Sequence, residues 1–242
     1  MKNNYYTDVF FDDLIDSLKS AKVIIPILLQ QISPKSVIDI GCGSGEFLQV
    51  FKENGISDVF GIEGPWLRKD RLRISKKQFK HADLKKKFSM DRKFDLAVSL
   101  EVAEHLPEKS AKTFVECLTK LAPIILFSAA VPLQGGVQHQ NEQWPEYWAN
   151  LFKENGYIPV DSLRKKIWNE PDVCVWYKQN ILLFVKKSYL KNLEVLKNEY
   201  KMVPFESLSI VHPDLFISKV GPLESIKKRI PHWMLPIISK II

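Results

Sequence analysis

Cysteine is scarce in this chain of 242 residues, which contains only Cys42, Cys117 and Cys174. The three cysteines lie far apart in the sequence, so no closely spaced pair of the kind that holds zinc is present. This scarcity excludes a disulfide-stapled secreted scaffold and favours a reducing compartment. Cys42 lies within a glycine-rich stretch, where we interpret it as a small filler residue rather than a nucleophile.

Long apolar runs are also lacking. The run at residues 23–29 is short and contains Pro26, whereas a membrane-spanning helix needs about 20 apolar residues. Acidic residues precede this run, unlike the start of a secretory signal peptide: Asp8, Asp12, Asp13 and Asp16. We therefore expect a cytoplasmic protein in which residues 23–29 form a preliminary helix covering one edge of a sheet.

The sequence contains no recognition helix or zinc module for nucleic acid, although its formal charge is +7. Basic residues cluster at residues 68–73, 76–80 and 85–87, and a basic surface attracts anionic partners. Aromatic residues are not interleaved with these clusters, as a stacking platform for bases would require. We interpret the clusters as a solvated face and expect no nucleic-acid partner.

The most informative feature is the segment SVIDIGCGSGEF at residues 36–47. Its first half is apolar and β-branched, which is typical of a strand buried on both faces. Glycines at alternate positions then let the backbone turn sharply and approach a ligand closely. The segment predicts a small-molecule-binding loop at the carboxyl end of a strand, with these glycines: Gly41, Gly43 and Gly45.

Two common phosphate-binding loops are excluded at this position. A Walker loop needs a Gly-Lys-Ser/Thr sequence that is missing, and a dinucleotide fingerprint needs a small residue where Glu46 lies. A carboxylate at this place would repel a pyrophosphate. A cofactor that carries sulfonium and ammonium groups would instead be attracted by it.

Acidic residues end the next two predicted strands. Residues 59–62 are followed by Glu63, and residues 79–83 end in Asp83. Glu63 lies about twenty residues beyond the glycines, where α/β nucleotide folds place the acid that binds ribose. The two oxygens of its carboxylate match the two hydroxyls of a ribose.

The rest of the chain predicts an α/β fold. Helices are expected at residues 108–121 and 144–152, the second with a core-facing aromatic stripe that Gly156 terminates. Further strands are expected at residues 94–100, 124–131, 157–160 and 181–185. We predict a Rossmann-like, doubly wound seven-stranded sheet, mostly parallel with an antiparallel last strand, plus helical N- and C-terminal extensions.

These motifs resemble the class I S-adenosylmethionine-dependent methyltransferase family. The sequence DIGCGSG at residues 39–45 is similar to its motif I, and the strand leading into EVAEHLP at residues 101–107 is similar to its fourth strand. The resemblance implies S-adenosylmethionine as the cofactor. The implied cofactor-binding residues are Asp39, Gly41, Gly43, Gly45, Glu63, Trp66, Asp83, Leu84, Ser99 and Leu100.

Several of these residues have individual roles in the resembled family. Asp83 would lie at the adenine amino group, and the backbone at Ser99 and Leu100 would border the methionine part. Trp66 would flank the adenine ring, with a buried core indole as the alternative. Glu63 stands where an Asp is usual, and its longer side chain should still reach the ribose.

Three longer segments, residues 61–67, 99–107 and 135–148, look like one bacterial subgroup associated with surface-polysaccharide or secondary-metabolite genes. This resemblance, which covers residues 36–188, implies O-methylation of a sugar hydroxyl on a bacterial surface polysaccharide or its precursor. The expected partner is thus a carbohydrate or small-molecule acceptor. Methylation of a small metabolite at oxygen or nitrogen, and a non-catalytic cofactor-binding subunit, stay open.

The loop after the fifth strand is expected to wall the acceptor pocket. His139 in this loop is the candidate general base because histidine transfers protons near neutral pH, and Glu142 is expected to orient it. His105 is the rival candidate, interpreted first as structural and second as acceptor-side. No convincing set of metal ligands is apparent, so no metal is predicted.

The chain is expected to divide into a helical segment, a methyltransferase domain and a helical extension, at residues 1–35, 36–188 and 189–242. The basic segment at residues 226–242 includes Trp233 and is a candidate for contact with the inner face of the cell membrane. Its prolines favour packing on the enzyme itself or on a second subunit. Membrane contact and a homo-oligomer therefore both stay open.

Overall fold

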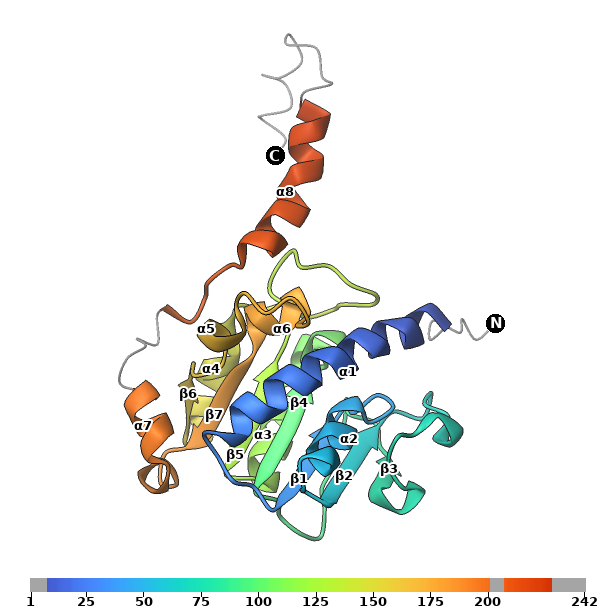
Figure 1. Ribbon diagram of the computed structural model, residues 1–242, viewed down its shortest axis with the longest axis vertical. Coiled ribbons are helices and arrows are strands. Elements are labelled where there is room, and N and C mark those ends of the chain that lie inside the picture. The colour runs from blue at the N-terminus through green and yellow to red at the C-terminus, as the bar shows by residue number, and fades with distance from the viewer. Residues whose placement is uncertain (1–7, 201–206, 228–242) are drawn as a thin grey trace.

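A seven-stranded mixed sheet forms the centre of the computed structural model, which describes residues 8–200 and 207–227 (Figure 1). The strand order is β3-β2-β1-β4-β5-β7-β6. Only β7 runs antiparallel to its neighbours, β5 and β6. The strands are β1 Ser36–Ile40, β2 Asp58–Glu63, β3 Phe79–His81, β4 Leu96–Leu100, β5 Ile124–Ser128, β6 Tyr157–Val160 and β7 Leu182–Lys186. The fold class predicted from the sequence is confirmed.

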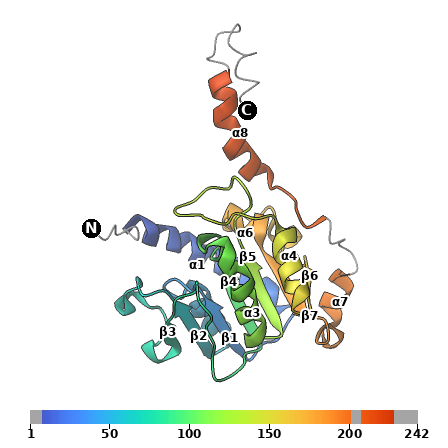
Figure 2. The ribbon, with the colours of Figure 1, turned by 180° about the vertical axis from the view of Figure 1, so that it is seen from behind.

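Helices cover both faces of this sheet, as a doubly wound fold requires. One face carries α1, α2, α5 and α6, and the other, seen in Figure 2, carries α3 and α4. The helices are α1 Asp8–Leu29, α2 Glu46–Glu53, α3 Ala111–Leu121, α4 Pro145–Glu154, α5 Arg164–Ile167, α6 Val175–Asn180, α7 Glu194–Tyr200 and α8 Pro213–Lys227.

The strand residues alternate between the two cores. Val37 belongs to the core under α1 and α2, whereas its neighbour Ile38 belongs to the core under α3 and α4. Both side chains are fully buried. Because both faces of the strand are covered, β1 is buried from Val37 to Ile40, including the polar side chain of Asp39.

The N-terminal helix differs from the prediction. A short helix at residues 23–29 covering a sheet edge was expected, but α1 spans 22 residues and lies across the face occupied by α2 (Figure 1). Pro26 lies inside the helix, and Gln30 donates its amide to the Pro26 carbonyl (3.2 Å). Burial of Ile24, Ile25 and Leu28 stabilises this placement.

The aromatic stripe of α4 packs into the core as predicted. Trp148 and Phe152 are buried, and the Phe152 ring stacks on Phe184 of β7 with centroids 3.9 Å apart. Trp144 precedes the helix and is 41% exposed, so it does not belong to the stripe. Gly156, with a φ of 80°, follows the helix where the chain turns into β6.

Tyr157 ties β6 to the end of α3, and this contact can be tested. Its hydroxyl donates towards the carbonyls of Thr119 (2.8 Å) and Ala122 (2.7 Å). We expect Tyr157→Phe to lower the free energy of unfolding by about 1–3 kcal/mol, because buried carbonyls lose their donor. Urea denaturation measures this change, and equal midpoints for both proteins would contradict it.

The described part of the C-terminal extension packs on the body through Leu190 and Leu196, and residues 208–212 are held to it by hydrogen bonds. Arg164 is buried and donates to the carbonyl of Leu208 (2.8 Å), and the amide of His212 donates to the Gln179 side chain. Beyond this point α8 projects away from the sheet (Figure 1). The segment 226–242, considered above for membrane contact, lies beyond the described residues except for its first two.

None of the helices among residues 8–200 and 207–227 is both long and apolar enough to cross a membrane.

Candidate functional site

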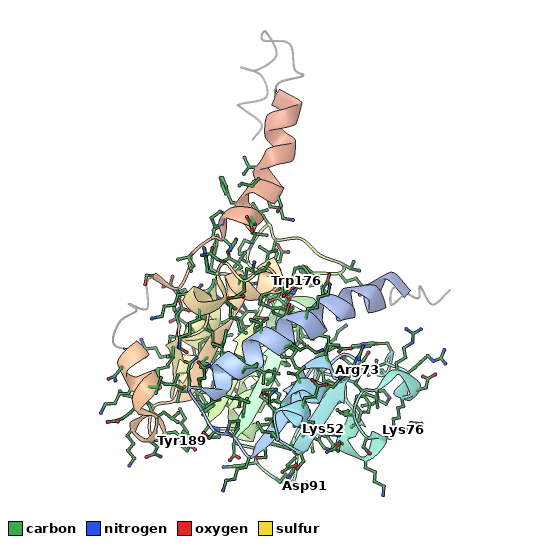
Figure 3. All side chains as sticks on the ribbon, in the orientation of Figure 1. Lys52, Arg73, Lys76, Asp91, Trp176 and Tyr189 are labelled. Carbon is green, nitrogen blue, oxygen red and sulfur yellow. The ribbon has the colours of Figure 1, made fainter. Side chains whose placement is uncertain are left out.

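A cavity of about 450 Å³ opens at the carboxyl ends of the parallel strands. It is lined by residues that follow β1, β2, β3, β4 and β5 in turn, and by Trp176, labelled in Figure 3, on α6. Its volume lies within the range of small-molecule sites. Of the residues predicted from the sequence, it is lined by Asp39, Gly41, Gly43, Glu63, Trp66, Asp83, Leu84, Leu100, His105 and His139.

The glycine loop has the conformation that only glycine adopts easily. Gly41, Gly43 and Gly45 have φ values of 82°, 54° and 94°. A Cβ atom on Gly41 would lie 2.3 Å from a methyl carbon of Val102, so the backbone there passes too close for any side chain. Gly45 starts α2 and does not line the cavity.

Glu63 holds the glycine loop against the end of β2. Its carboxylate accepts hydrogen bonds from the amides of Gly43 (2.9 Å) and Gly64 (2.7 Å). Burial raises the pKa of Glu63 to about 7, although both amide hydrogen bonds oppose this. The carboxylate is thus buried, oriented and placed in the cavity wall.

Two further buried carboxylates lie beside Glu63. Asp39 has a pKa raised well above its usual value by burial and by the charges of Glu63 and Glu46. Glu46 forms an ion pair with Arg73 (3.1 Å), and burial still raises its pKa. Arg73 lies beside α2 in Figure 3. Three acids with one guanidinium make this end of the cavity suited to a cationic ligand.

Trp66, Asp83 and Leu84 form the far rim of the same end. Trp66 is 46% exposed, which excludes the alternative of a buried core indole. Its ring lies over Gly64, where a Cβ atom would come within 2.0 Å of it. Asp83 accepts from the Lys85 amide (3.1 Å), and Leu84 is buried.

The side chain of Ser99, another predicted residue, does not line the cavity. It is fully buried within β4, where it pairs with Phe127, and Leu100 is the first residue of that strand to reach the cavity. The prediction for Ser99 and Leu100 concerned their backbone at the strand end, and that part stays a prediction.

At the opposite end, His139 and Glu142 lie in contact. Nδ1 of His139 is 2.8 Å from a carboxylate oxygen of Glu142, which also accepts from the amides of Leu133 (2.8 Å) and Gly135 (2.7 Å). Glu142 therefore holds both the loop and the imidazole, without lining the cavity itself. Leu133 and Gln138 have positive φ values of 69° and 61°, a strain often found at functional loops.

His105 lies against His139, with ring centroids 4.8 Å apart and the planes at 89°. Burial and the neighbouring His139 lower the pKa of His105 to about 4. Its imidazole is therefore neutral at physiological pH. The position of His105 in the cavity wall is compatible with both predicted roles, the structural one and the acceptor-side one.

Three further polar residues lie at this end: Glu101, which opens the EVAEHLP segment and was expected near the pocket by its position, and Gln134 and Tyr177, which were not predicted. Glu101 has a φ of 54° and accepts hydrogen bonds from Gln134 (2.9 Å) and Asn180 (3.1 Å). Gln134 and Tyr177 line the cavity too, Tyr177 from α6 just before β7. No local pattern in the sequence distinguishes Gln134 and Tyr177, because only the tertiary fold brings them to the cavity.

A family model described as "Methyltransferase domain" matches residues 17–168. No curated protein sequence matches the chain significantly.

Solved structures with low sequence identity share the fold. A sugar N-methyltransferase from Streptoalloteichus is 14% identical, with a TM-score of 0.57 over 74% of this chain and 92% of its own. A SAM-bound amino pentose methyltransferase from Micromonospora echinaspora is 14% identical, with a TM-score of 0.55 over 77% and 100%. An SAH-bound magnesium protoporphyrin IX methyltransferase from Synechocystis is 17% identical, with a TM-score of 0.51 over 72% and 84%.

The family match covers more than half of the chain and includes the glycine loop, Glu63, Asp83 and the end of β4. The cofactor predicted from the sequence is the one this family uses. The chain therefore belongs to the methyltransferase domain family, within the S-adenosylmethionine-dependent class that its glycine loop predicted.

Proposed function

We propose that this protein transfers a methyl group from S-adenosylmethionine to a sugar hydroxyl of a bacterial surface polysaccharide or its precursor. The observation that carries the proposal is one cavity with two chemically distinct ends. Buried acids and the glycine loop form the donor end, and the oriented pair His139–Glu142 lies at the acceptor end.

The donor end fits the cofactor group by group. Glu63 would accept hydrogen bonds from both ribose hydroxyls, and Trp66 and Asp83 would bind the adenine ring and its amino group. Asp39 would face the positively charged methionine part, helped by the neighbouring Glu46. The narrow loop at Gly41 and Gly43 would let the backbone approach the cofactor.

The acceptor end supplies the proton transfer that a hydroxyl needs. The sulfonium already activates the methyl group, so the protein has to align the acceptor oxygen and remove its proton. An ionised Glu142 only accepts hydrogen bonds, so it fixes the proton of His139 on Nδ1 and leaves the lone pair on Nε2. In the proposed direct mechanism, this lone pair takes the proton of the acceptor hydroxyl.

A second candidate is methylation of an amino sugar or another small metabolite at nitrogen. Two of the structural neighbours are an amino pentose methyltransferase and a sugar N-methyltransferase. An amine that is neutral when it binds needs less base catalysis than a hydroxyl. A non-catalytic subunit is disfavoured by the oriented His139, which a pure binding protein does not need.

The pKa of Glu63 predicts how cofactor affinity depends on pH. Only the ionised carboxylate accepts from both ribose hydroxyls, and a proton occupies it below about pH 7. Linkage then lowers the affinity for S-adenosylmethionine about tenfold between pH 8 and pH 6, whereas Glu63→Gln should bind weakly and equally at both. Calorimetric titration at the two pH values measures this, and a flat wild-type profile would refute the ribose assignment.

The acceptor itself is tested by mass spectrometry of surface glycan from cells with and without the gene. We expect loss of one methyl group per repeat or per chain end, restored by the wild-type gene and not by a glycine-loop variant. An unchanged glycan, with cofactor binding established, would move the assignment to a small-metabolite acceptor.

A further inference from the structure

Three side chains with metal-binding atoms converge at the acceptor end of the cavity. Glu104, His105 and His139 each offer one ligand atom, and these atoms all lie within 4.8 Å of one another. Glu104 and His105 follow β4, whereas His139 comes from the loop after β5. A glutamate and two histidines form a mixed oxygen and nitrogen donor set of the kind that binds divalent transition-metal ions.

The loop that carries His139 is fastened directly to Glu104. The carbonyl oxygen of Glu104 accepts hydrogen bonds from the amides of Gln140 (2.8 Å) and Asn141 (3.0 Å). The side chain of Gln140 also donates to the carbonyl of His105 (3.1 Å). The three candidate ligands are therefore held together by backbone contacts, with no need for a bound ion to gather them.

The buried carboxylate of Glu104 gives the strongest support for an ion at this place. Glu104 is fully buried and lines the cavity, yet neither of its side-chain oxygens accepts a hydrogen bond of normal geometry from the described residues. Burial and the neighbouring charge of Glu101 raise its pKa well above the usual value. The amides of Glu104 and Ala130 oppose this rise only in part. A buried carboxylate so weakly paired is costly unless it takes up a proton or a cation.

Each of the two histidines can offer one ring nitrogen to an ion. Nδ1 of His139 is engaged by Glu142 (2.8 Å), which leaves Nε2 as the ligand atom. A carboxylate behind the imidazole is the usual outer partner of a metal-bound histidine, because it fixes the tautomer and the ring orientation. His105 is neutral, with a hydrogen bond to the backbone of Val137.

We propose that Glu104, His105 and His139 bind one divalent transition-metal ion, of the Mn²⁺ or Zn²⁺ type, with open positions for the acceptor. This deepens the proposed function and rests on it for the reaction. The acceptor hydroxyl binds the ion through oxygen and releases its proton to water, since a cation lowers the pKa of a bound hydroxyl. The oxygen then forms the new bond to the methyl carbon as the methyl–sulfur bond breaks, and the sulfonium becomes a neutral thioether.

The ion changes the role of His139 from the direct mechanism. One lone pair on Nε2 cannot both bind a metal and take a proton. With an ion bound, His139 holds the ion, and Glu142 acts as a positioning residue behind it. The proposal is therefore distinct from simple base catalysis and can be separated from it by measurement.

The first experiment measures metal binding without cofactor or acceptor. Chelator-treated protein is titrated with Mn²⁺ and with Zn²⁺ by calorimetry, using the wild type, Glu104→Gln, His139→Ala and the control His81→Ala. His81 bonds the Gly64 carbonyl (2.9 Å) and does not line the cavity. We expect one ion per chain for the wild type and the control, and at least a 100-fold weaker affinity in the two cluster variants.

Folding of the variants is checked by thermal unfolding, and Glu104→Gln should be no less stable because it keeps the size of the side chain and removes a group whose ionisation burial opposes. No saturable binding of either ion by the wild type, or equal binding by Glu104→Gln and the wild type, would overturn the site. Full methyl transfer after chelation would overturn the role of the ion and leave the proposed function intact. Tight binding at the cluster without transfer to any hydroxyl acceptor would contradict the proposed function and leave the ion site standing.

Discussion

Replacing His139 with alanine should lower the rate of methyl transfer by about 10²–10⁴-fold, the range that a positioned proton-transfer group supplies. The imidazole lies at the acceptor end, at 12% side-chain exposure, and the donor carboxylates lie on other elements of the sheet. Affinity for S-adenosylmethionine should therefore change by no more than about twofold. Single-turnover kinetics and a separate cofactor titration measure the two quantities.

Two further variants separate this effect from general damage to the loop. Val137 lies two residues away and is 65% exposed, so Val137→Ala should keep the wild-type rate. Glu142→Gln keeps the size of the side chain and weakens its hold on Nδ1, so its rate should lie between the wild type and His139→Ala. A His139→Ala variant with full turnover would remove His139 from the mechanism, both as a base and as a metal ligand.

The second large effect concerns the donor end. Gly41→Ala should lower affinity for S-adenosylmethionine by at least about 100-fold, because the added methyl group meets Val102 and the backbone φ of 82° disfavours any side chain. The loop can relieve the contact only by leaving the conformation that lines the cavity. Equilibrium dialysis with labelled cofactor measures the change.

Gly55→Ala is the matched control for this variant. Gly55 has a similar φ of 88°, but a Cβ atom there would meet nothing within 4 Å, so the substitution introduces backbone strain alone. It should lower stability by about 1–2 kcal/mol and leave cofactor affinity unchanged. Adding Val102→Ala to Gly41→Ala should restore part of the affinity, and a double variant no better than Gly41→Ala would show that the steric explanation is wrong.

The parts of this molecule that could be predicted from the sequence are those determined by residues close together in the chain. The β-branched residues of β1 and the glycines after it define a buried parallel strand and its loop within a few residues of each other. The acid at the end of β2 follows at a set distance, because strand, loop and helix have narrow ranges of length. For this reason the sheet and the residues proposed for the donor end could be predicted from the sequence.

The acceptor end was harder to predict from the sequence because its residues meet only in the folded chain. His105 and His139 are 34 positions apart in number, and their contact depends on the hydrogen bonds from Gln140 and Asn141 to Glu104. The missing partners of the Glu104 carboxylate are likewise a property of packing. The sequence therefore showed no convincing set of metal ligands, although His105 and His139 had each been singled out for other roles.

The anchoring of the loop after β5 has a consequence for which of its positions can vary. The Glu142 carboxylate accepts hydrogen bonds from main-chain amides at the start of the loop, and the Glu104 carbonyl accepts them from amides at its end. The tip at residues 136–138 is exposed. A Cβ atom on Gly136 would lie 2.2 Å from Nε2 of His139, so any side chain at this position would displace the imidazole. Val137 is exposed and can vary without disturbing His139 or the glycine loop, whereas position 136 has to remain glycine.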